Sequence, residues 1–456
     1  MDPLGAAMRH LPLLRLSLIT SAGFTAAALL AAPDSPNMSE AFQASLLLLT
    51  EERRKHFEDG KGMMRQIWLA APAAEPDRDK DGLGPLFNER SCDACHPGNA
   101  RGRPPERAGE RLSSALVRLS VIENGSAVPH PSYGLQFNEQ GIPGVPGEGR
   151  ASVSYTEKSV RLADGEVVRL RKPQVSFRDL NYGAIDGAVL TSLRVSPPVF
   201  GMGLLDAVPE SSLLELADEG DWDKDGISGR PNRVWSPQLG RPVVGRFGLK
   251  ASIGDLRTQI ATALSEDIGI TNPRFPKSRC TSVQRACLAA PSGGEPEITP
   301  ATNHHLPDFM ALLAPPPRRH VEDPATQRGE VLFRSLGCAA CHRETLRTGK
   351  SPAYLELSEV TFHPYTDLLL HDLGPGLSDG RPDEQATGSE WRTAPLWGIG
   401  LAQVFDKGAR FLHDGRARTL TEAIVWHDGE ARAASEGFRK LKKAERKDLL
   451  AFLDSL

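Results

Sequence analysis

Two short stretches decide how this chain is interpreted: "SCDACH" at 91–96 and "GCAACH" at 337–342. Each contains Cys-x-x-Cys followed directly by histidine, and together they use four of the chain's 6 cysteines. A Cys-x-x-Cys pair alone has three common interpretations: a redox dithiol, half of a zinc site, or a haem c attachment site. The histidine favours haem c, because the two thiols then bind the haem vinyl groups and the next imidazole binds the iron.

The occurrence of two such motifs predicts two covalently bound haem c groups. The cysteines outside the motifs do not have the spacing of zinc ligands, which makes a zinc site harder to support. The expected attachment and proximal residues are Cys92, Cys95 and His96 for haem 1, and Cys338, Cys341 and His342 for haem 2.

The N-terminus has the order of a secretory signal peptide. Arg9, His10 and Arg15 precede the apolar run "LSLITSAGFTAAALLAA". A membrane anchor is the alternative, but the run is short for one and rich in Ala, Ser and Thr. We expect a signal peptide at 1–32, cleaved near Ala28–Ala32, and export to the periplasm. Nothing downstream approaches a spanning run, so we expect no membrane span in the mature chain.

The net charge bears on the possible partners. It is −4 with both signs mixed along the chain, which gives no case for nucleic acid or an anionic membrane as a partner.

Cys280 and Cys287 are the only cysteines outside the motifs. In an oxidising compartment they are expected to form a disulfide, with two reduced, buried thiols as the alternative.

An internal repeat follows each motif. "PPVFGMGLL" (197–205) and "APLWGIGLA" (394–402) share a proline, an aromatic residue, two glycines and a leucine in register. Each half also closes with a similar helical segment, "DFMALLAPP" from Asp308 and "DLLAFLDSL" from Asp448. These matches indicate a duplication, and two unrelated glycine-rich loops are the alternative.

The repeat predicts two cytochrome c-like haem domains in a mainly α fold. The proline-rich "APPPRRHVEDPATQ" (314–327) is the expected linker, which places a first haem c domain with insertions at 33–318 and a second at 319–456. An amphipathic helix is expected before the second motif, and another at the C-terminus that packs across it. The alternating stretches "ASVSYTEKSVRL" and "EVVRLRKPQVSF" predict β-hairpin insertions in the first domain.

A second near-repeat resembles the start of a calcium loop. "DWDKDGISGRPN" places Asp221, Asp223 and Asp225 at positions 1, 3 and 5, with glycine at position 6. Asn232 occupies position 12, where a calcium loop needs a bidentate glutamate. Calcium is therefore a candidate ligand, and solvated Asp/Gly turns are the alternative. The similar stretch from Asp77 runs straight into the first haem motif, which favours the turn there.

Longer motifs resemble a known family. "YTDLLLHDLGPGLSD", "WRTAPLWGIG" and "FLHDGRARTLTEAIVWHDGEA" in the second half, with "GLGPLFNERSCDACH" and "GRFGLKASIGDLRTQ" in the first, resemble the di-haem oxidoreductase family. That family is related to the bacterial di-haem cytochrome c peroxidases and the MauG-type enzymes. The resemblance extends over roughly residues 45–456.

The resemblance implies axial ligands for the two haems. In the peroxidase relatives the distal ligand of haem 2 follows the "HDG…TLEEAV" stretch, and here that position is His427, with His371 and His413 as fallback ligands. The relatives also carry a releasable histidine after the first motif, but "PGNARGRPPERAG" contains none. Haem 1 is therefore either five-coordinate or has an unassigned sixth ligand. The candidates for that ligand are His130, Met202, Met63 and Met64.

The resemblance also implies a function, that of a periplasmic di-haem c oxidoreductase of the peroxidase type. Haem 2 would receive electrons from a small cytochrome or cupredoxin, and hydrogen peroxide would react at haem 1. Gln136 or Glu139 could act as the proton shuttle by their polarity. Trp391 and Trp397 could bridge the haems, with packing as the alternative role. Two other functions stay open: a pure electron-transfer cytochrome, or an oxidoreductase acting on a thiol or an organic substrate.

Overall fold

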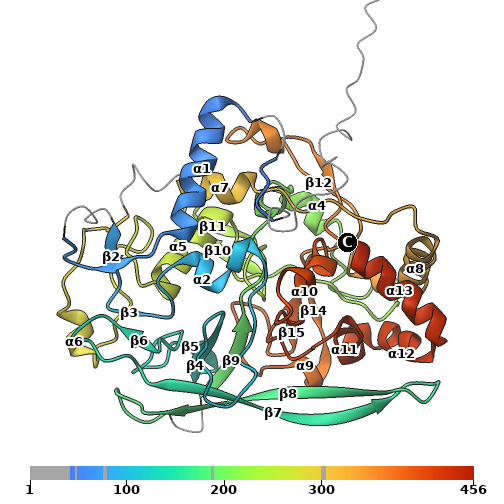
Figure 1. Ribbon diagram of the computed structural model, residues 1–456, viewed down its shortest axis with the longest axis horizontal. Helices are drawn as coiled ribbons and strands as arrows, with labels where there is room; N and C mark the ends of the chain where they lie inside the picture. The colour runs from blue at the N-terminus through green and yellow to red at the C-terminus, as the bar shows by residue number, and fades with distance from the viewer. Residues whose placement is uncertain (1–41, 47–48, 75–79, 186–188, 299–304) are drawn as a thin grey trace, which may run out of the picture.

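The computed structural model describes residues 42–46, 49–74, 80–185, 189–298 and 305–456. The predicted signal peptide lies outside these residues. Two groups of helices sit above a long two-stranded ribbon that runs beneath both halves of the chain (Figure 1). In the part of the chain that the structure describes, none of the helices has the length and apolar character of a membrane-spanning segment.

Most helices are short and are separated by loops. The α-helices are α1 (Glu51–Arg65), α2 (Cys92–Cys95), α3 (Met202–Asp206), α4 (Glu210–Leu214), α5 (Leu256–Asp267), α6 (Arg285–Leu288), α7 (His305–Leu312), α8 (Pro324–Ser335), α9 (Gly374–Leu377), α10 (Ala402–Phe405), α11 (Leu420–Trp426), α12 (Arg432–Lys440) and α13 (Lys443–Ser455). The 3-10 helices are η3 (Pro97–Asn99), η4 (Cys338–Ala340), η5 (Leu355–Leu357), η6 (Ile399–Leu401) and η7 (Gly429–Ala431).

The strands form one three-stranded sheet, in the order β5-β4-β9, and a series of two-stranded pairs. Their bounds are β1 (Leu69–Ala70), β2 (Asp81–Leu83), β3 (Leu86–Phe87), β4 (Ala115–Glu123), β5 (Ser126–Val128), β6 (Gln140–Gly141), β7 (Arg150–Arg161), β8 (Val167–Arg178), β9 (Leu190–Val195), β10 (Arg233–Ser236), β11 (Arg241–Val244), β12 (Leu346–Arg347), β13 (Thr361–Phe362), β14 (Leu370–Asp372) and β15 (Glu390–Arg392).

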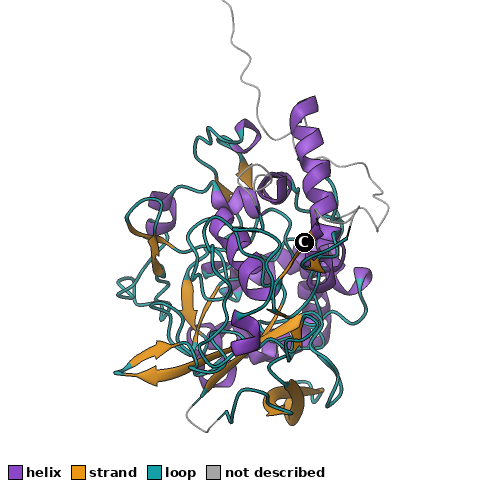
Figure 2. Ribbon diagram, turned by 90° about the vertical axis from the view of Figure 1, so that its left-hand side faces the viewer, coloured by secondary structure: helices purple, strands orange, loops and turns teal. Residues whose placement is uncertain are grey.

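The prediction of a mainly α fold built from two cytochrome c-like domains is wrong. The residues that the structure describes are 30% helical and 20% strand, with many small sheets. Figure 2 shows strands and long loops spread among the helices. The physical reason lies in the sequence between the first motif and α5, where alternating β-branched residues favour strands and frequent Pro and Gly interrupt helices. The helical periodicity near the motifs does not extend over this segment.

Two pairs of helices cross at glycine, one pair in each half. Helix α1 crosses α7, and a Cβ at Gly60 would lie 2.2 Å from the carbonyl oxygen of His305. Helix α8 crosses α13 in the same way, and a Cβ at Gly329 would lie 2.0 Å from the carbonyl oxygen of Asp448. Only glycine allows backbones to approach this closely. The expected helix before the second motif and the expected C-terminal helix that crosses it are thus confirmed as α8 and α13.

The two repeated glycine-rich loops pack against each other at the centre of the molecule. A Cβ at Gly201 would lie 2.4 Å from Cζ2 of Trp397, and one at Gly398 would lie 2.7 Å from Cζ of Phe200. Both glycines have positive φ, +72° and +71°. Each loop therefore receives the aromatic ring of the other, a reciprocal contact that the duplication explains.

The ribbon along the bottom of Figure 1 is the predicted hairpin, formed by β7 and β8. It pairs from Arg150 opposite Arg178 to Arg161 opposite Val167. Its far end joins the hydrophobic core of the second half, where Leu170 belongs to the same cluster as residues of α11 and α12. Because the two largest hydrophobic clusters both draw residues from either side of position 318, the expected boundary there stays a prediction.

Candidate functional site

The first motif is held by a short helix and one backbone acceptor. Ser91 caps α2, its Oγ accepting a hydrogen bond from the amide of Ala94 at 3.2 Å. His96 follows, and its Nδ1 donates to the carbonyl oxygen of Pro197 at 2.7 Å. A carbonyl oxygen only accepts, so the proton of the neutral ring is on Nδ1 and Nε2 keeps its lone pair. This arrangement is the one that a metal-binding histidine requires.

The second motif repeats this arrangement with different residues. Gly337, at φ +85°, ends the segment after α8 and opens η4. His342 Nδ1 donates to the carbonyl oxygen of Tyr365 at 3.0 Å, which again leaves the lone pair on Nε2. Burial lowers the pKa of both His96 and His342, the latter to about 4. Both imidazoles are therefore neutral at physiological pH and suited to bind a metal.

His427 has the same tautomer and lies close to His342. It caps the C-terminus of α11, and its Nδ1 donates to the carbonyl oxygen of Ala423 at 2.8 Å. Burial lowers its pKa. Burial is the main cause of the low pKa of His342. The ring of His427 is near enough to lower this pKa further through its electrostatic interaction. Two neutral histidines with free Nε2 lone pairs suit the two axial positions of one iron.

The four motif cysteines are unpaired and deeply desolvated. Burial raises the pKa of Cys92 and of Cys338 to about 12, so both are neutral thiols. The motif cysteines are half-buried and do not belong to the fully packed core. The protein that surrounds them nevertheless shields their thiols from water. A planar prosthetic group needs such a setting, with the chain around it but not packed into its place.

Trp426, next to His427, carries a second sign of a bound group. Its Nε1 is buried and has no hydrogen-bond partner among the residues described. Lys158 Nζ lies 4.3 Å from the ring centroid, and the guanidinium of Arg416 lies 4.7 Å from it. An unpartnered donor with two cations nearby fits an anionic substituent such as a haem propionate.

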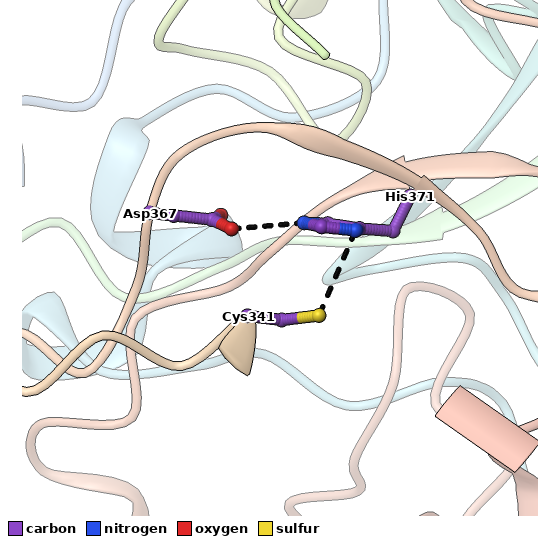
Figure 3. Close-up of side chains that lie close together, drawn as sticks. All are labelled: Cys341, Asp367 and His371. Carbon is purple, nitrogen blue, oxygen red and sulfur yellow. Dashed lines mark hydrogen bonds and ion pairs between the residues drawn. The ribbon is translucent and has the colours of Figure 1, made fainter. Parts of the chain in front are cut away.

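His371 is locked between carboxylates, as Figure 3 shows in part. Its Nε2 lies 2.8 Å from Asp367 Oδ2, while Nδ1 lies 2.7 Å from Glu430 Oε2 and 3.6 Å from Cys341 Sγ. Burial opposes the positive charge, but hydrogen bonds to Asp367, Cys341 and Glu430 raise the pKa of His371 to about 12.

This lock decides between two roles for His371. Cys341, Asp367 and His371 together are close enough to hold a metal ion. An imidazolium has no lone pair for a metal, however, and Cys341 belongs to the second motif. We therefore assign His371 to orienting Cys341, which makes it a poorer axial ligand than His427.

The other fallback ligand, His413, is engaged as well. Its ring stacks on Trp391 with centroids 3.6 Å apart, and its Nε2 lies 3.3 Å from Asp414 Oδ2. Trp391 Nε1 donates to the carbonyl oxygen of Leu377 at 3.1 Å, and Lys250 Nζ lies 4.3 Å from the Trp391 ring. Both aromatic rings are thus held in a buried stack.

The first half contributes a buried polar network next to the first motif. Gln136 Nε2 donates to Asn88 Oδ1 and to Asp267 Oδ1, both at 2.7 Å. Burial is the largest cause of the raised pKa of Cys92 and of Cys95, and the negative charge of Asp267 is the second largest. Burial also raises the pKa of Asp267 itself, to about 6. Gln136 is thus joined to the first motif through Asp267, and its expected role as a proton shuttle stays a prediction. Asp267 carried no sequence signal and was missed.

A cavity of about 310 Å³ opens beside this network. Its wall includes Gln136, Glu266, His130 and Glu148. It also includes the disulfide between Cys280 and Cys287, which the structure contains. Glu139, the other proposed proton shuttle, is engaged elsewhere, because its Oε1 accepts a hydrogen bond from the amide of Ala151 at 2.8 Å.

The candidates for the sixth ligand of haem 1 fall into two groups. Met64 is packed in the first hydrophobic core, and Met63 and Met202 pack against it, half-buried. His130 Nδ1 accepts a hydrogen bond from the amide of Ser132 at 3.1 Å. Its neutral ring then carries the proton on Nε2, which does not suit a metal ligand. The three methionines are not separated by these contacts.

The aspartates of the predicted calcium loop come together only in part. Asp221 and Asp223 lie with Asp218 within 4.8 Å of one another, whereas Asp225 Oδ1 accepts from the amide of Ile227. Asn232 is buried, and its Oδ1, the atom that would bind a cation, accepts a hydrogen bond from the amide of Gln385 at 3.0 Å, so position 12 is engaged elsewhere. Asp218 precedes the motif by three positions and was therefore not recognised.

The comparisons with known proteins bear on this geometry. No curated protein sequence matches the chain significantly. Among solved structures, a hydrazine synthase of Kuenenia stuttgartiensis pressurised with xenon matches at 13% identity, over 98% of this chain and 100% of that one. Its TM-score of 0.37 carries no argument about the fold. The model of the family described as "Di-haem oxidoreductase, putative peroxidase" matches residues 30–456. The chain therefore belongs to the di-haem oxidoreductase family.

Proposed function

We propose that this chain is a periplasmic di-haem c oxidoreductase of the peroxidase type, with both haems bound covalently. The observation that carries the proposal is the shared state of His96, His342 and His427, each half-buried, neutral and protonated on Nδ1. Two of these histidines directly follow Cys-x-x-Cys. Bound haem iron supplies the one-electron redox steps that no side chain of this site provides.

At the second motif four residues would hold haem 2. Cys338 and Cys341 would form thioether bonds to it, and His342 and His427 would bind its iron. The carboxylates of Asp367 and Glu430 hold His371 against Cys341, which keeps the cysteine oriented. An iron bound by two histidines has no open position for a substrate, so these residues suit a haem that would transfer electrons only.

At the first motif the chain supplies protons. Reduction of hydrogen peroxide to two waters consumes two electrons and two protons. Asp267 exchanges a proton near neutral pH, since burial raises its pKa to about 6, and Gln136 holds its Oδ1 in place. Neither residue would be needed beside a haem that only carries electrons.

Trp397 connects the two sites. Its ring lies on Gly201, four residues after Pro197, whose carbonyl holds His96. The neighbouring amide of Leu396 donates to the carbonyl oxygen of Pro364 at 2.9 Å, beside the carbonyl that holds His342. Trp397 therefore spans the loops that position both proximal histidines, and we assign the bridging role to it over Trp391.

The cavity beside Gln136 favours a second candidate function. Its volume of about 310 Å³ compares with roughly 30 Å³ for a water molecule in the liquid, so hydrogen peroxide would fill little of it. Pockets of this size accommodate small organic ligands. A thiol or organic molecule as the oxidised substrate is therefore the alternative to peroxide.

Low-temperature electron paramagnetic resonance of the exported holoprotein tests the proposal. We expect one low-spin bis-histidine signal from haem 2 and, after half-reduction, an accessible haem 1 that turns over peroxide with a reduced small cytochrome or cupredoxin as donor. Two low-spin signals that persist after half-reduction would contradict it and favour a pure electron carrier. An open haem 1 that ignores peroxide but responds to thiols or organic molecules would favour the second candidate.

A further inference from the structure

Three strongly exposed hydrophobic side chains lie between residues 222 and 239. Trp222 is 84% exposed, Trp235 on β10 is 62% exposed, and Leu239 in the turn after β10 is 61% exposed. We call these three residues the Trp222 surface. Single exposed hydrophobic residues are ordinary, but two exposed tryptophans with a leucine are typical of interaction sites.

Contacts of the backbone and of neighbouring charges hold this surface together. Burial alternates along β10, so Arg233 and Trp235 share its exposed face. Arg233 Nη2 lies 3.5 Å from Glu219 Oε1, which places the loop before Trp222 beside that face. The indole of Trp222 covers Gly220, where a Cβ would lie 2.5 Å from Cε2. Trp222 is therefore exposed but supported, as a docking residue needs to be.

A short path joins Trp222 to the second haem motif. The amide of Trp222 donates to Asp218 Oδ1 at 2.9 Å, and the amide of Asp218 donates to the carbonyl oxygen of Gly229 at 2.9 Å. Gly229 packs on the ring of His371, since a Cβ there would lie 2.7 Å from Cε1. His371 Nδ1 then lies 3.6 Å from Cys341 Sγ (Figure 3). Three polar contacts and one packing contact thus span from the surface to a haem-binding cysteine.

A second branch makes the path rigid. The amide and the hydroxyl of Ser228 donate to the two carboxylate oxygens of Glu430, each at 3.1 Å. Glu430 in turn bonds His371 Nδ1 at 2.7 Å. Gly229 therefore contacts His371 directly and Ser228 is linked to it through Glu430, so the loop that carries Trp222 cannot move away from Cys341 without breaking these bonds.

The charge around Trp222 indicates what kind of partner would bind. The segment 218–225 contains five acidic residues and one lysine. Arg233, on the same face, pairs with Glu219, so the charge around Trp222 stays net acidic. An apolar centre with such a rim is complementary to a protein that surrounds an apolar contact patch with lysines. Electrostatic steering between such surfaces speeds association at low ionic strength.

We propose that the Trp222 surface is the docking site of a small basic redox protein that reduces haem 2. This inference rests on the proposed function, because it assumes a haem at Cys338 and Cys341. In the step itself one electron leaves the reduced partner, which is oxidised, and reduces ferric haem 2. No bond or proton is exchanged.

Binding of an oxidised basic monohaem cytochrome c to the oxidised holoprotein, measured by isothermal titration calorimetry at low ionic strength, tests this. We expect Trp222→Ala to raise the Kd about tenfold, the usual size of a tryptophan hot spot. The pair Asp221→Lys and Asp223→Lys should raise the Kd at least about as much and flatten its salt dependence. Leu355→Ala, at a side chain that is 78% exposed, and Glu322→Lys, at an exposed linker position, are matched controls with unchanged Kd.

Several outcomes would overturn the proposal. One is an unchanged Kd in Trp222→Ala, even if charge reversal weakens binding, because steering alone does not need this contact. Another is an equal rise of the Kd in the control variants Leu355→Ala and Glu322→Lys. Stopped-flow reduction of haem 2 should slow in parallel with the loss of binding. If wild-type protein binds the cytochrome through this surface but never turns over peroxide, the proposed function fails and the docking site stands.

Discussion

Helix α1 contains two glycines, one packed against α7 and one facing open space. Alanine substitutions at these two positions therefore test the crossing of α1 and α7. A Cβ added at Gly60 would lie 2.2 Å from the carbonyl oxygen of His305 and 2.5 Å from Cβ of Phe309. A Cβ added at Gly62 would meet nothing within 4 Å. Gly60→Ala and Gly62→Ala therefore add the same methyl group to the same helix, once into a helix crossing and once into open space.

The expected free energies of unfolding change in opposite directions. At Gly60 the backbone of α7 must move by roughly 1 Å or more to reach an ordinary contact distance, and overpacking of this kind costs about 1–3 kcal/mol. Alanine recovers about 1 kcal/mol of helix propensity at either position. Gly60→Ala should therefore lose up to about 2 kcal/mol, while Gly62→Ala should gain about 0.5–1 kcal/mol.

Denaturant unfolding of the holoprotein, followed in parallel by circular dichroism and by haem absorbance, measures both variants under one condition. The midpoint should fall for Gly60→Ala and rise or stay for Gly62→Ala. Gly329→Ala, whose Cβ would lie 2.0 Å from the carbonyl oxygen of Asp448, should behave like Gly60→Ala. A Gly60→Ala protein that is as stable as the Gly62→Ala protein, or a Gly62→Ala protein destabilised as much as Gly60→Ala, would refute the helix crossing as described.

Three further predictions concern the haem sites. Replacing Cys338 and Cys341 together by alanine should remove one of the two haems in the pyridine haemochrome assay, and loss of neither would contradict the attachment sites. His427→Ala should abolish the low-spin signal of haem 2 whereas His371→Gln should retain it, and the opposite pattern in electron paramagnetic resonance would exchange their roles. Asp267 has a folded-state pKa of about 6, above the usual 3.8, so its contribution to stability is complete below pH 3.8 and is lost as the pH rises through 6. Asp267→Asn should remove this pH-dependent loss of stability. If the variant and the wild type show the same pH dependence of unfolding between pH 4 and 7, the raised pKa of Asp267 is contradicted.

Local chemistry was readable from the sequence alone. The Cys-x-x-Cys-His motif can be recognised from the sequence alone, because the thiols and the imidazole must follow one another in the chain to reach one haem. The hairpin of β7 and β8 and the helices α8 and α13 were likewise predictable, since period-2 and period-3.6 patterns reflect local backbone geometry. The family resemblance, which the family model confirms, also lies in short contiguous motifs.

Tertiary structure decided what depends on partners far apart in the chain. The family resemblance ranks His427 above His371 and His413, but it gives no physical reason for that order. The fold brings Asp367 and Glu430 onto the two nitrogens of His371, while the Nδ1 of His427 donates to a backbone carbonyl instead. The pKa of Asp267 and its place beside the first motif arise in the same way, from burial that no local pattern encodes. The strand content was missed for the same reason, because strands gain their hydrogen bonds from other segments whereas a helix satisfies its own.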